Sequence, residues 1–287
     1  MNMTHKIDDF TVLPSDSNNV YQTYLEFVKR KKSLNIKEME RRGWVDQSNT
    51  ANVASVFKEF LTAQNKGTTL YRKTADSDNV APLAWVSRVK QIANLYVGLN
   101  DNPDFEGLDK ADLKQIAKMS ASLDAISDVQ SILYEKGVIV IYEQALPGMK
   151  ADGACFKLST GHPVVALSLR YSRVDNFWFT LLHELAHVSL HYDQLDDVII
   201  DDLDEADASL IEQQANQLAL NSFIPRSAWR NCEPKFSRDS KDVITFAKRM
   251  EIHPAVVAGR LRHELGRYDL FTDIINETNV RGILFHD

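Results

Sequence analysis

The stretch Phe179–His187 reads FTLLHELAH, and it contains the pattern His-Glu-x-x-His inside an apolar run that is typical of a helix. His183 and His187 are four residues apart, so on a helix they lie on one face with their Cβ atoms about 6 Å apart. Two imidazoles at this spacing can both bind one zinc ion, and Glu184 can take a proton from a water on that metal. The stretch therefore predicts the working part of a zinc-dependent peptidase.

An ordinary core helix is the alternative interpretation of this stretch. Its apolar residues Phe177, Leu182 and Ala186 would suit any buried helix that carries two polar residues on its solvent face. The chain has eight histidines, so a short pattern of this kind can also occur by accident. A third metal ligand at a suitable place in the sequence is what would decide between the two interpretations.

A second helix, expected over residues 209–221, offers that third ligand. Glu212 follows His187 after a segment long enough for a loop and a returning helix. Asn216 stands one turn later on the same helix face, where its side-chain oxygen can accept the free N–H of a metal-binding imidazole. Without the two histidines, Glu212 would be interpreted as an exposed helix residue. Together with them, the interpretation of Glu212 as the third metal ligand is favoured.

Other polar residues near the pattern are less favoured as metal ligands. His191 is expected to support or pack against the site rather than to bind the ion, because a pair with His187 would not leave Glu184 in its place. The acidic stretch 193–207 is interpreted as a solvated linker in preference to a calcium loop or a charged rim, since it lacks the EF-hand spacing. Within it, Asp204 and Glu205 remain alternative acidic ligands.

Composition describes an ordinary globular chain. The 287 residues are 44% hydrophobic and 25% charged, and 33 Lys and Arg against 40 Asp and Glu give a net charge of −7. This balance argues against non-specific nucleic-acid binding by the whole chain. Residues 1–100 carry 14 basic and 10 acidic residues, so they have a local net charge of +4.

The compartment is expected to be the cytoplasm. Residues 1–14 lack the pattern of a secretory signal, and no apolar run is long enough to span a bilayer. Two cysteines, Cys155 and Cys232, exclude a disulfide scaffold as the main source of stability. Each is expected to be packed or exposed rather than bound to the metal.

The pattern of apolar residues predicts an α+β fold. Helices are expected in the first 100 residues and over 110–119 and 125–136, with Gly137 ending the last of these. About three strands are expected, over 138–142, 154–159 and 163–169, and the metal helix is expected to be capped by Asp175 or Asn176. The chain is predicted to divide into a helical region (1–100), a metallopeptidase domain (105–235) and a C-terminal helical subdomain (238–287).

Three segments carry a resemblance to the ImmA/IrrE family of bacterial zinc metallopeptidases: FTLLHELAHVSLH at residues 179–191, EQQANQLALNSFIP at residues 212–225, and FAKRMEIHPAVVAGRLRHE at residues 246–264. The last is similar to a tail found after the peptidase domain in many members that are fused to helix-turn-helix regulators. The resemblance covers residues 105–287 well and residues 57–85 weakly. One departure is Gln214, where the family often has a second Glu.

The resemblance implies a zincin-like core in which His183, His187 and Glu212 bind Zn²⁺ in a gluzincin-like arrangement and Glu184 is the general base. It also implies an intracellular endopeptidase that cleaves a helix-turn-helix repressor or antitoxin, and so acts on stress or mobile-element genes. Two alternatives stay open: a non-proteolytic regulator or antitoxin-like protein that uses the fold as a sensor or scaffold, and a zinc hydrolase that does not act on proteins. No convincing helix-turn-helix is found in residues 1–60, and direct DNA binding is left open.

The donor that would stabilise a tetrahedral oxyanion is not decided by the sequence. Candidates from neighbouring segments are Arg170, Tyr171, Arg173, Tyr192 and His253, although His253 is more typical of a structural residue at the start of a helix that opens with Pro254. The strand over 163–169 could pair with an extended substrate, or it could lie inside the sheet with no free edge.

Overall fold

The structure is a computed structural model that describes residues 17–45, 56–59, 61, 79–201 and 209–285. At its centre lies a sheet of four described strands in the order β1-β3-β2-β4. The strands are β1 (Ile139–Tyr142), β2 (Gly153–Lys157), β3 (Pro163–Leu167) and β4 (Ile199–Asp201). β1 is parallel to β3, and β2 is antiparallel to both β3 and β4. Because β3 lies between β1 and β2, it has no free edge, so the possibility that it pairs with a substrate is wrong.

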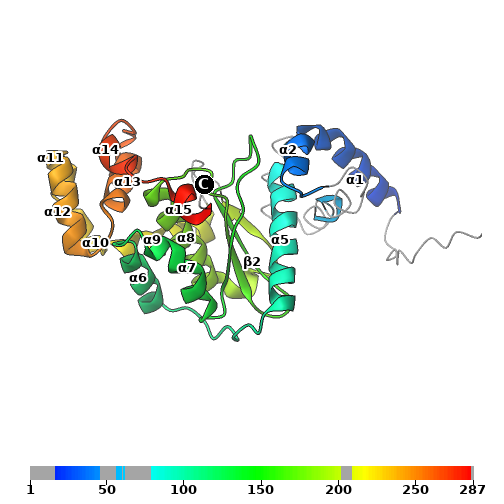
Figure 1. Cartoon of the computed structure of the whole chain (residues 1–287), viewed down its shortest axis with the longest axis horizontal. Helices are drawn as coiled ribbons and strands as arrows, with labels where there is room; N and C mark the ends of the chain where they lie inside the picture. Colours follow the sequence, from blue (N-terminus) through cyan, green and yellow to red (C-terminus); the bar gives the residue numbers. More distant parts are fainter. Residues whose placement is uncertain (1–16, 46–55, 60, 62–78, 202–208, 286–287) are drawn as a thin grey trace, which may run out of the picture.

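The two faces of the sheet pack against different helices. One face contributes residues such as Val140, Cys155 and Val165 to a core shared with α6 (Lys110–Met119), α7 (Ala125–Tyr134), α8 (Val174–His191) and α9 (Leu210–Phe223). The opposite face packs against α5 (Ala81–Leu99), beyond which lie α1 (Ser17–Arg30), η1 (Lys31–Ser33) and α2 (Ile36–Arg41). Figure 1 shows the sheet edge-on between these two layers.

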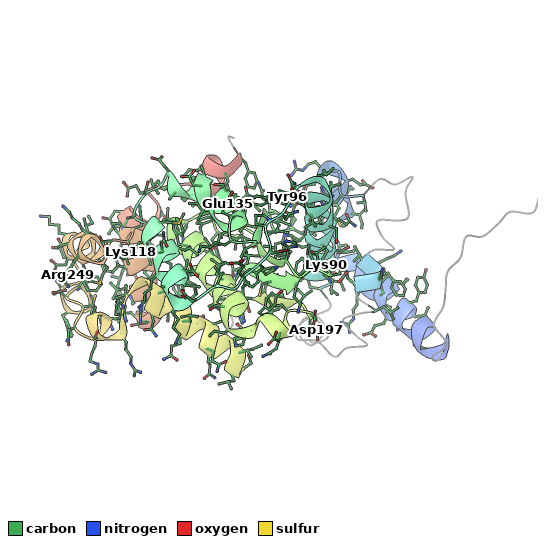
Figure 2. The ribbon with its side chains drawn as sticks, turned by 90° about the horizontal axis from the view of Figure 1, so that it is seen from below. Lys90, Tyr96, Lys118, Glu135, Asp197 and Arg249 are labelled. Atoms are coloured by element: carbon green, nitrogen blue, oxygen red, sulfur yellow. The ribbon has the colours of Figure 1, made fainter. Side chains whose placement is uncertain are left out.

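The C-terminal quarter is helical and extends the α8 layer. It comprises α10 (Arg226–Arg230), α11 (Pro234–Ser237), α12 (Ser240–Met250), α13 (Pro254–Leu265), α14 (Thr272–Ile275) and α15 (Val280–Phe285). α13 packs on α8, and α15 returns to α7. In Figure 2, Arg249 of α12 and Lys90 of α5 lie toward opposite ends of the long axis.

The α+β class predicted from the sequence is confirmed, with one strand more than expected. The additional strand, β4, lies within the acidic stretch 193–207, whose charges favour a linker in the sequence. Asp204 and Glu205 lie outside the described residues. The predicted cap of the metal helix is wrong: α8 begins at Val174, and Asp175 lies in its first turn, where its carboxylate pairs with Arg173 at 3.0 Å. The division into three domains stays a prediction.

Gly137 and His253 lie at helix ends, as the sequence indicates. Gly137 follows α7 with a φ of 72°, and His253 is the N-cap of α13, where its Nδ1 accepts a hydrogen bond from the backbone N–H of Ala255 at 3.1 Å. Among the described helices, none combines the length and the apolar character that a bilayer span requires.

Candidate metal centre

His183 and His187 lie one turn apart on α8 and are fully buried. Their Nε2 atoms are 3.1 Å apart, so both rings present the same nitrogen to one point. This is the arrangement that the four-residue spacing predicts. Two imidazole nitrogens this close have lone pairs that repel each other unless a proton or a metal ion lies between them.

The opposite nitrogen of each ring is held by a neighbour that fixes its tautomer. Asn216 Oδ1 lies 3.1 Å from Nδ1 of His183, so it accepts the N–H of that ring, as expected from its place on α9. Gln214 Oε1 lies 3.0 Å from Nε2 of His191, which leaves Nδ1 of His191 to accept from Nδ1 of His187 at 3.1 Å. In the neutral form of both rings, the Nε2 atoms then carry no proton and are available to a metal ion.

His191 thus supports His187 from behind, which agrees with the interpretation that it is not itself a ligand. It lies within the buried part of α8, and burial lowers its pKa, so that the neutral ring is favoured. Gln214, the departure from the family pattern, supplies the carbonyl oxygen that fixes the tautomer of His191.

Glu212 points into the same cluster from α9. Ser209 caps this helix by accepting a hydrogen bond from the backbone N–H of Glu212 at 3.4 Å, which places Glu212 in the first turn. Its Oε2 lies 3.2 Å from Nε2 of His183 and 3.4 Å from Nε2 of His187. Although burial would raise the pKa of Glu212, its hydrogen bonds to the two histidines lower it well below the usual range.

Asp201, which the sequence analysis did not single out, is the fourth member of the cluster. Its Oδ2 lies 2.9 Å from Nε2 of His183 and 3.7 Å from Nε2 of His187. Ile199 faces the α8 core and Ile200 faces the opposite core, so the period of two along β4 turns Asp201 toward α8. The run Val198-Ile199-Ile200 was the available signal for a strand at this point.

The chemistry of these four residues fits a divalent metal ion. One atom from each of His183, His187, Asp201 and Glu212 lies within 4.8 Å of all the others, and all four residues are buried. Burial alone would lower the pKa of His183, but the charge of Asp201 and the hydrogen bonds to both carboxylates raise it well above its usual value. The cluster therefore favours positive charge at its centre, and a metal ion bound by two imidazoles and carboxylates would supply it.

Glu184 lies beside this cluster and is completely buried. Neither of its oxygens has a hydrogen-bond partner of normal geometry among the described residues, although the buried thiol of Cys155 lies close enough to interact with it. Burial and the negative charge of Asp201 raise the pKa of Glu184 well above its usual value. A buried carboxylate without partners is costly to keep, which marks it as a group with a chemical role.

The candidates for the oxyanion donor are used in other contacts. Arg170 forms an ion pair with Asp152 at 2.7 Å, and Arg173 pairs with Asp175. The hydroxyl of Tyr192 donates to the backbone oxygen of Gly161 at 2.5 Å. Tyr171 lies beneath the guanidinium groups of Arg170 and Arg173, and His253 caps α13.

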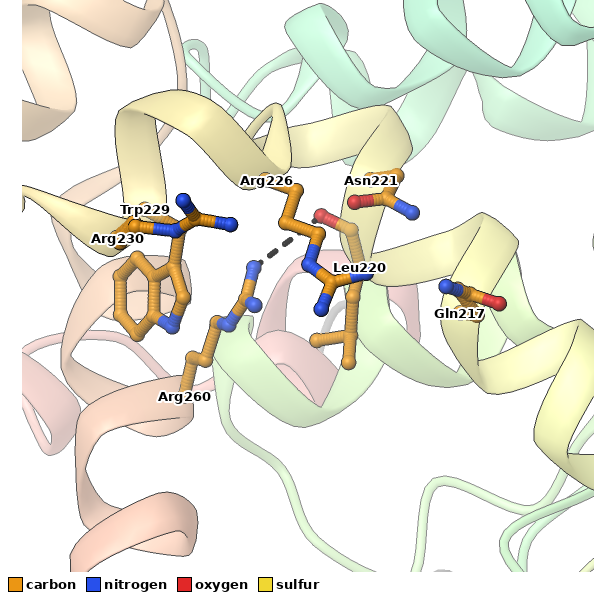
Figure 3. A pocket seen from close by; sticks show the side chains of 7 residues that line it. All are labelled: Gln217, Leu220, Asn221, Arg226, Trp229, Arg230 and Arg260. Carbon is orange, nitrogen blue, oxygen red and sulfur yellow. Dashed lines mark hydrogen bonds between the residues drawn. The ribbon is translucent and has the colours of Figure 1, made fainter.

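A surface pocket lies further along α9 and is separate from the cluster. It has a volume of about 300 Å³, and Figure 3 shows that α9, α10 and α13 contribute its side chains. Arg260 crosses it and donates to the backbone oxygen of Leu220 at 3.4 Å while stacking on Trp229. None of the four clustered residues lines this pocket, so the buried chemistry, rather than the pocket, defines the candidate site.

Comparison with known proteins identifies the part of the chain that carries this site. Residues 135–262 match the family model Peptidase_M78, the IrrE N-terminal-like domain. This segment is an ImmA/IrrE-type peptidase domain, which confirms the resemblance of residues 179–191 and 212–225, whereas the similarity of residues 246–264 to a regulator tail stays a prediction. It contains the whole sheet, α8, α9 and the four clustered residues. A search of curated proteins found no match for the chain.

Proposed function

We propose that this protein is a zinc-dependent endopeptidase whose metal ligands include His183, His187 and Glu212 and whose general base is Glu184. The observation that carries the proposal is the convergence of both Nε2 atoms and a Glu212 oxygen within 3.4 Å of one another. The match to a peptidase family model over the same residues supports a proteolytic function.

Zinc bound at this centre would polarise the scissile carbonyl and lower the pKa of a water toward about 7. With zinc bound, the carboxylate of Glu184 would accept a proton from the water and would deliver it to the leaving amine. Asn216 and the His191–Gln214 pair hold the two imidazoles in the tautomer that leaves Nε2 unprotonated. The enclosed position of Glu184 shields it from bulk water, and burial raises its pKa well above the usual value.

The substrate that we propose is a helix-turn-helix repressor or an antitoxin-type protein in the cytoplasm. The proposal extends the resemblance of residues 179–225, and it makes the protein an activator of genes that the repressor silences. The alternative, a regulator that uses the fold without proteolysis, is motivated by the mildly basic region 1–100. The two are distinguished by whether the partner is cut.

The test is to incubate the purified full chain with the product of the neighbouring regulator gene, with and without a chelator, and to look for discrete fragments. Glu184→Gln is expected to keep its zinc and lose activity by about 10²- to 10⁴-fold, whereas the exposed Glu135→Gln serves as a matched control with unchanged activity. His183→Ala is expected to lose the zinc. A Glu184→Gln protein that keeps zinc and still cuts the partner would refute the assigned base.

A further inference from the structure

We infer that Asp201 is a fourth protein ligand of the metal, so that the folded protein is a closed, latent form of the peptidase. The inference rests on the proposed function, because it assumes that His183, His187 and Glu212 bind zinc. It goes beyond that function by giving the resting protein no open coordination position.

Five of the six separations among the four candidate ligand atoms are close to those of a tetrahedron around one zinc ion. Ligand atoms at 2.0–2.1 Å from zinc in tetrahedral geometry are separated from one another by about 3.3 Å. The two Nε2 atoms and Oε2 of Glu212 form a triangle with sides of 3.1, 3.2 and 3.4 Å. Oδ2 of Asp201 lies 2.9 and 3.7 Å from the two nitrogens, so the average of these five separations is close to the tetrahedral edge.

The nitrogen that Asp201 contacts distinguishes a metal ligand from a supporting residue. A carboxylate that orients a metal-bound histidine from behind accepts the N–H of the nitrogen that does not bind the metal. In this protein those nitrogens are the two Nδ1 atoms, which face Asn216 and His191. Asp201 faces the two Nε2 atoms, as Glu212 does, and therefore lies on the metal side of both rings.

Four protein ligands change what the centre can do. Zinc sites with four protein ligands are typical of structural sites, whereas catalytic sites keep one position for water or substrate. With Asp201 in place, the water that Glu184 would deprotonate has no position on the metal.

The place of Asp201 in the fold suits a ligand that can be withdrawn. The three other residues belong to α8 and α9, the two helices that pack against each other most extensively among the described elements. Asp201 ends a three-residue strand at the edge of the described sheet, and its backbone is held by a hydrogen bond from the N–H of Asp152 to its carbonyl oxygen at 2.7 Å. Displacing β4 therefore removes one ligand while the helices keep the other three.

The experiment replaces zinc by cobalt(II), whose visible spectrum reports its coordination, and uses acetohydroxamate as a probe for an open position. The full chain is compared with Asp201→Asn, which keeps the side-chain shape, and with Asp201→Ala. Asp193→Asn, on the exposed part of the same segment, is the matched control, and His183→Ala tests the centre itself. Thermal melting shows whether each variant is folded.

We expect wild-type protein and Asp193→Asn to share one cobalt spectrum that acetohydroxamate changes only at high concentration. Both Asp201 variants should show an altered spectrum, respond to lower concentrations of acetohydroxamate, and bind the metal more weakly. A gain in cleavage of unfolded casein by the Asp201 variants would agree with release of latency. Either Asp201 variant is sufficient for the test, so if one does not fold, the other is used.

The outcomes separate this inference from the proposed function. Cobalt binding that is lost in His183→Ala, together with Asp201 variants that match wild type in spectrum, metal affinity and acetohydroxamate response, overturns the role of Asp201 and leaves the zinc centre standing. A wild-type chain that binds no cobalt, or a His183→Ala chain that binds it unchanged, overturns the proposed function and this inference with it.

Discussion

The carboxylate of Glu184 lies against the backbone of Gly153, closer than any side chain at position 153 would permit. A Cβ built on Gly153 would lie 2.9 Å from Cδ of Glu184 and 2.8 Å from Cγ2 of Thr180, and closer still to Oε1 of Glu184. β2 therefore approaches α8 at Glu184, the proposed general base, because it has glycine there. The φ of Gly153 is not in the left-handed region, so space rather than backbone conformation requires the glycine.

Gly153→Ala is expected to move the Glu184 carboxylate while leaving the metal ligands in place. The atoms nearest to the added methyl group are ends of side chains, so the variant should still fold. The carboxylate of Glu184, however, would be displaced. We expect kcat/KM to fall by about 100-fold, within the range that a positioned base contributes, with unchanged zinc content. Gly98→Ala, where the added Cβ meets nothing within 4 Å, is the control. Full activity in Gly153→Ala would show that Glu184 does not depend on this contact.

Asn216→Ala is expected to weaken zinc binding, because the ring of His183 loses the acceptor that fixes its tautomer. Residues that orient a metal ligand from behind typically change metal affinity by about 10- to 100-fold. Asn216→Asp keeps an oxygen at the same place and should restore most of the affinity. The measurement is competition with a chromophoric chelator, and Gln217→Ala, an exposed neighbour on α9, should bind zinc as wild type does. Equal affinity in Asn216→Ala would show that packing alone orients the ring.

The contrast between Glu212 and Asp201 shows how far the sequence predicts this site. Glu212 stands on a helix whose period places it opposite a recognisable pattern, so a local rule was enough to propose it. Asp201 depends on a three-residue strand whose pairing with β2 is a contact between distant parts of the chain. A short strand among acidic residues carries almost no periodic signal, and its pairing depends on tertiary contacts that a local window does not contain.

The start of α8 and the position of β3 also depend on contacts that the local sequence does not contain. The helix begins one or two residues earlier than the predicted cap because Val174 packs into the core and no side chain caps the end. β3 lies inside the sheet because β1 and β2 pair with its two edges. The kind of each element could be predicted from the residues, whereas its neighbours could not.

Both cysteines are expected to react slowly in the folded protein. Cys155 and Cys232 are free and fully buried, and burial raises the pKa of Cys232 to about 11 and that of Cys155 well above its usual value. At pH 8, a thiol with a pKa of about 11 is roughly one part in a thousand thiolate, the form that reacts. A disulfide reagent should therefore label almost no thiol in native protein and two per chain in denaturant. Rapid labelling of one native thiol would show that its surroundings open.

The contact between α13 and the helix that carries the two histidines depends on Gly259. A Cβ built on Gly259 would lie 2.5 Å from Oδ2 and 2.7 Å from Cβ of Asp175, which is buried in the first turn of α8. Cβ of Asp175 is fixed to the helix backbone, so Gly259→Ala must push the two helices apart. Overpacking of this kind costs about 1–3 kcal/mol of unfolding free energy, and the melting temperature should fall by about 2–4 °C for each kcal/mol.

Gly282→Ala is the matched control for this change, because its added Cβ would lie 3.7 Å or more from its nearest neighbour, the side chain of Asn279. The proposed metal ligands lie two or more turns further along α8 and on other elements, so Gly259→Ala should bind zinc with the affinity of the wild type once it is folded. If instead Gly259→Ala melts like Gly282→Ala, then α13 yields without cost, and the C-terminal helices are only loosely attached to the peptidase core. Comparing the two variants by calorimetry therefore measures how firmly residues 238–287 are coupled to the helix of the metal centre.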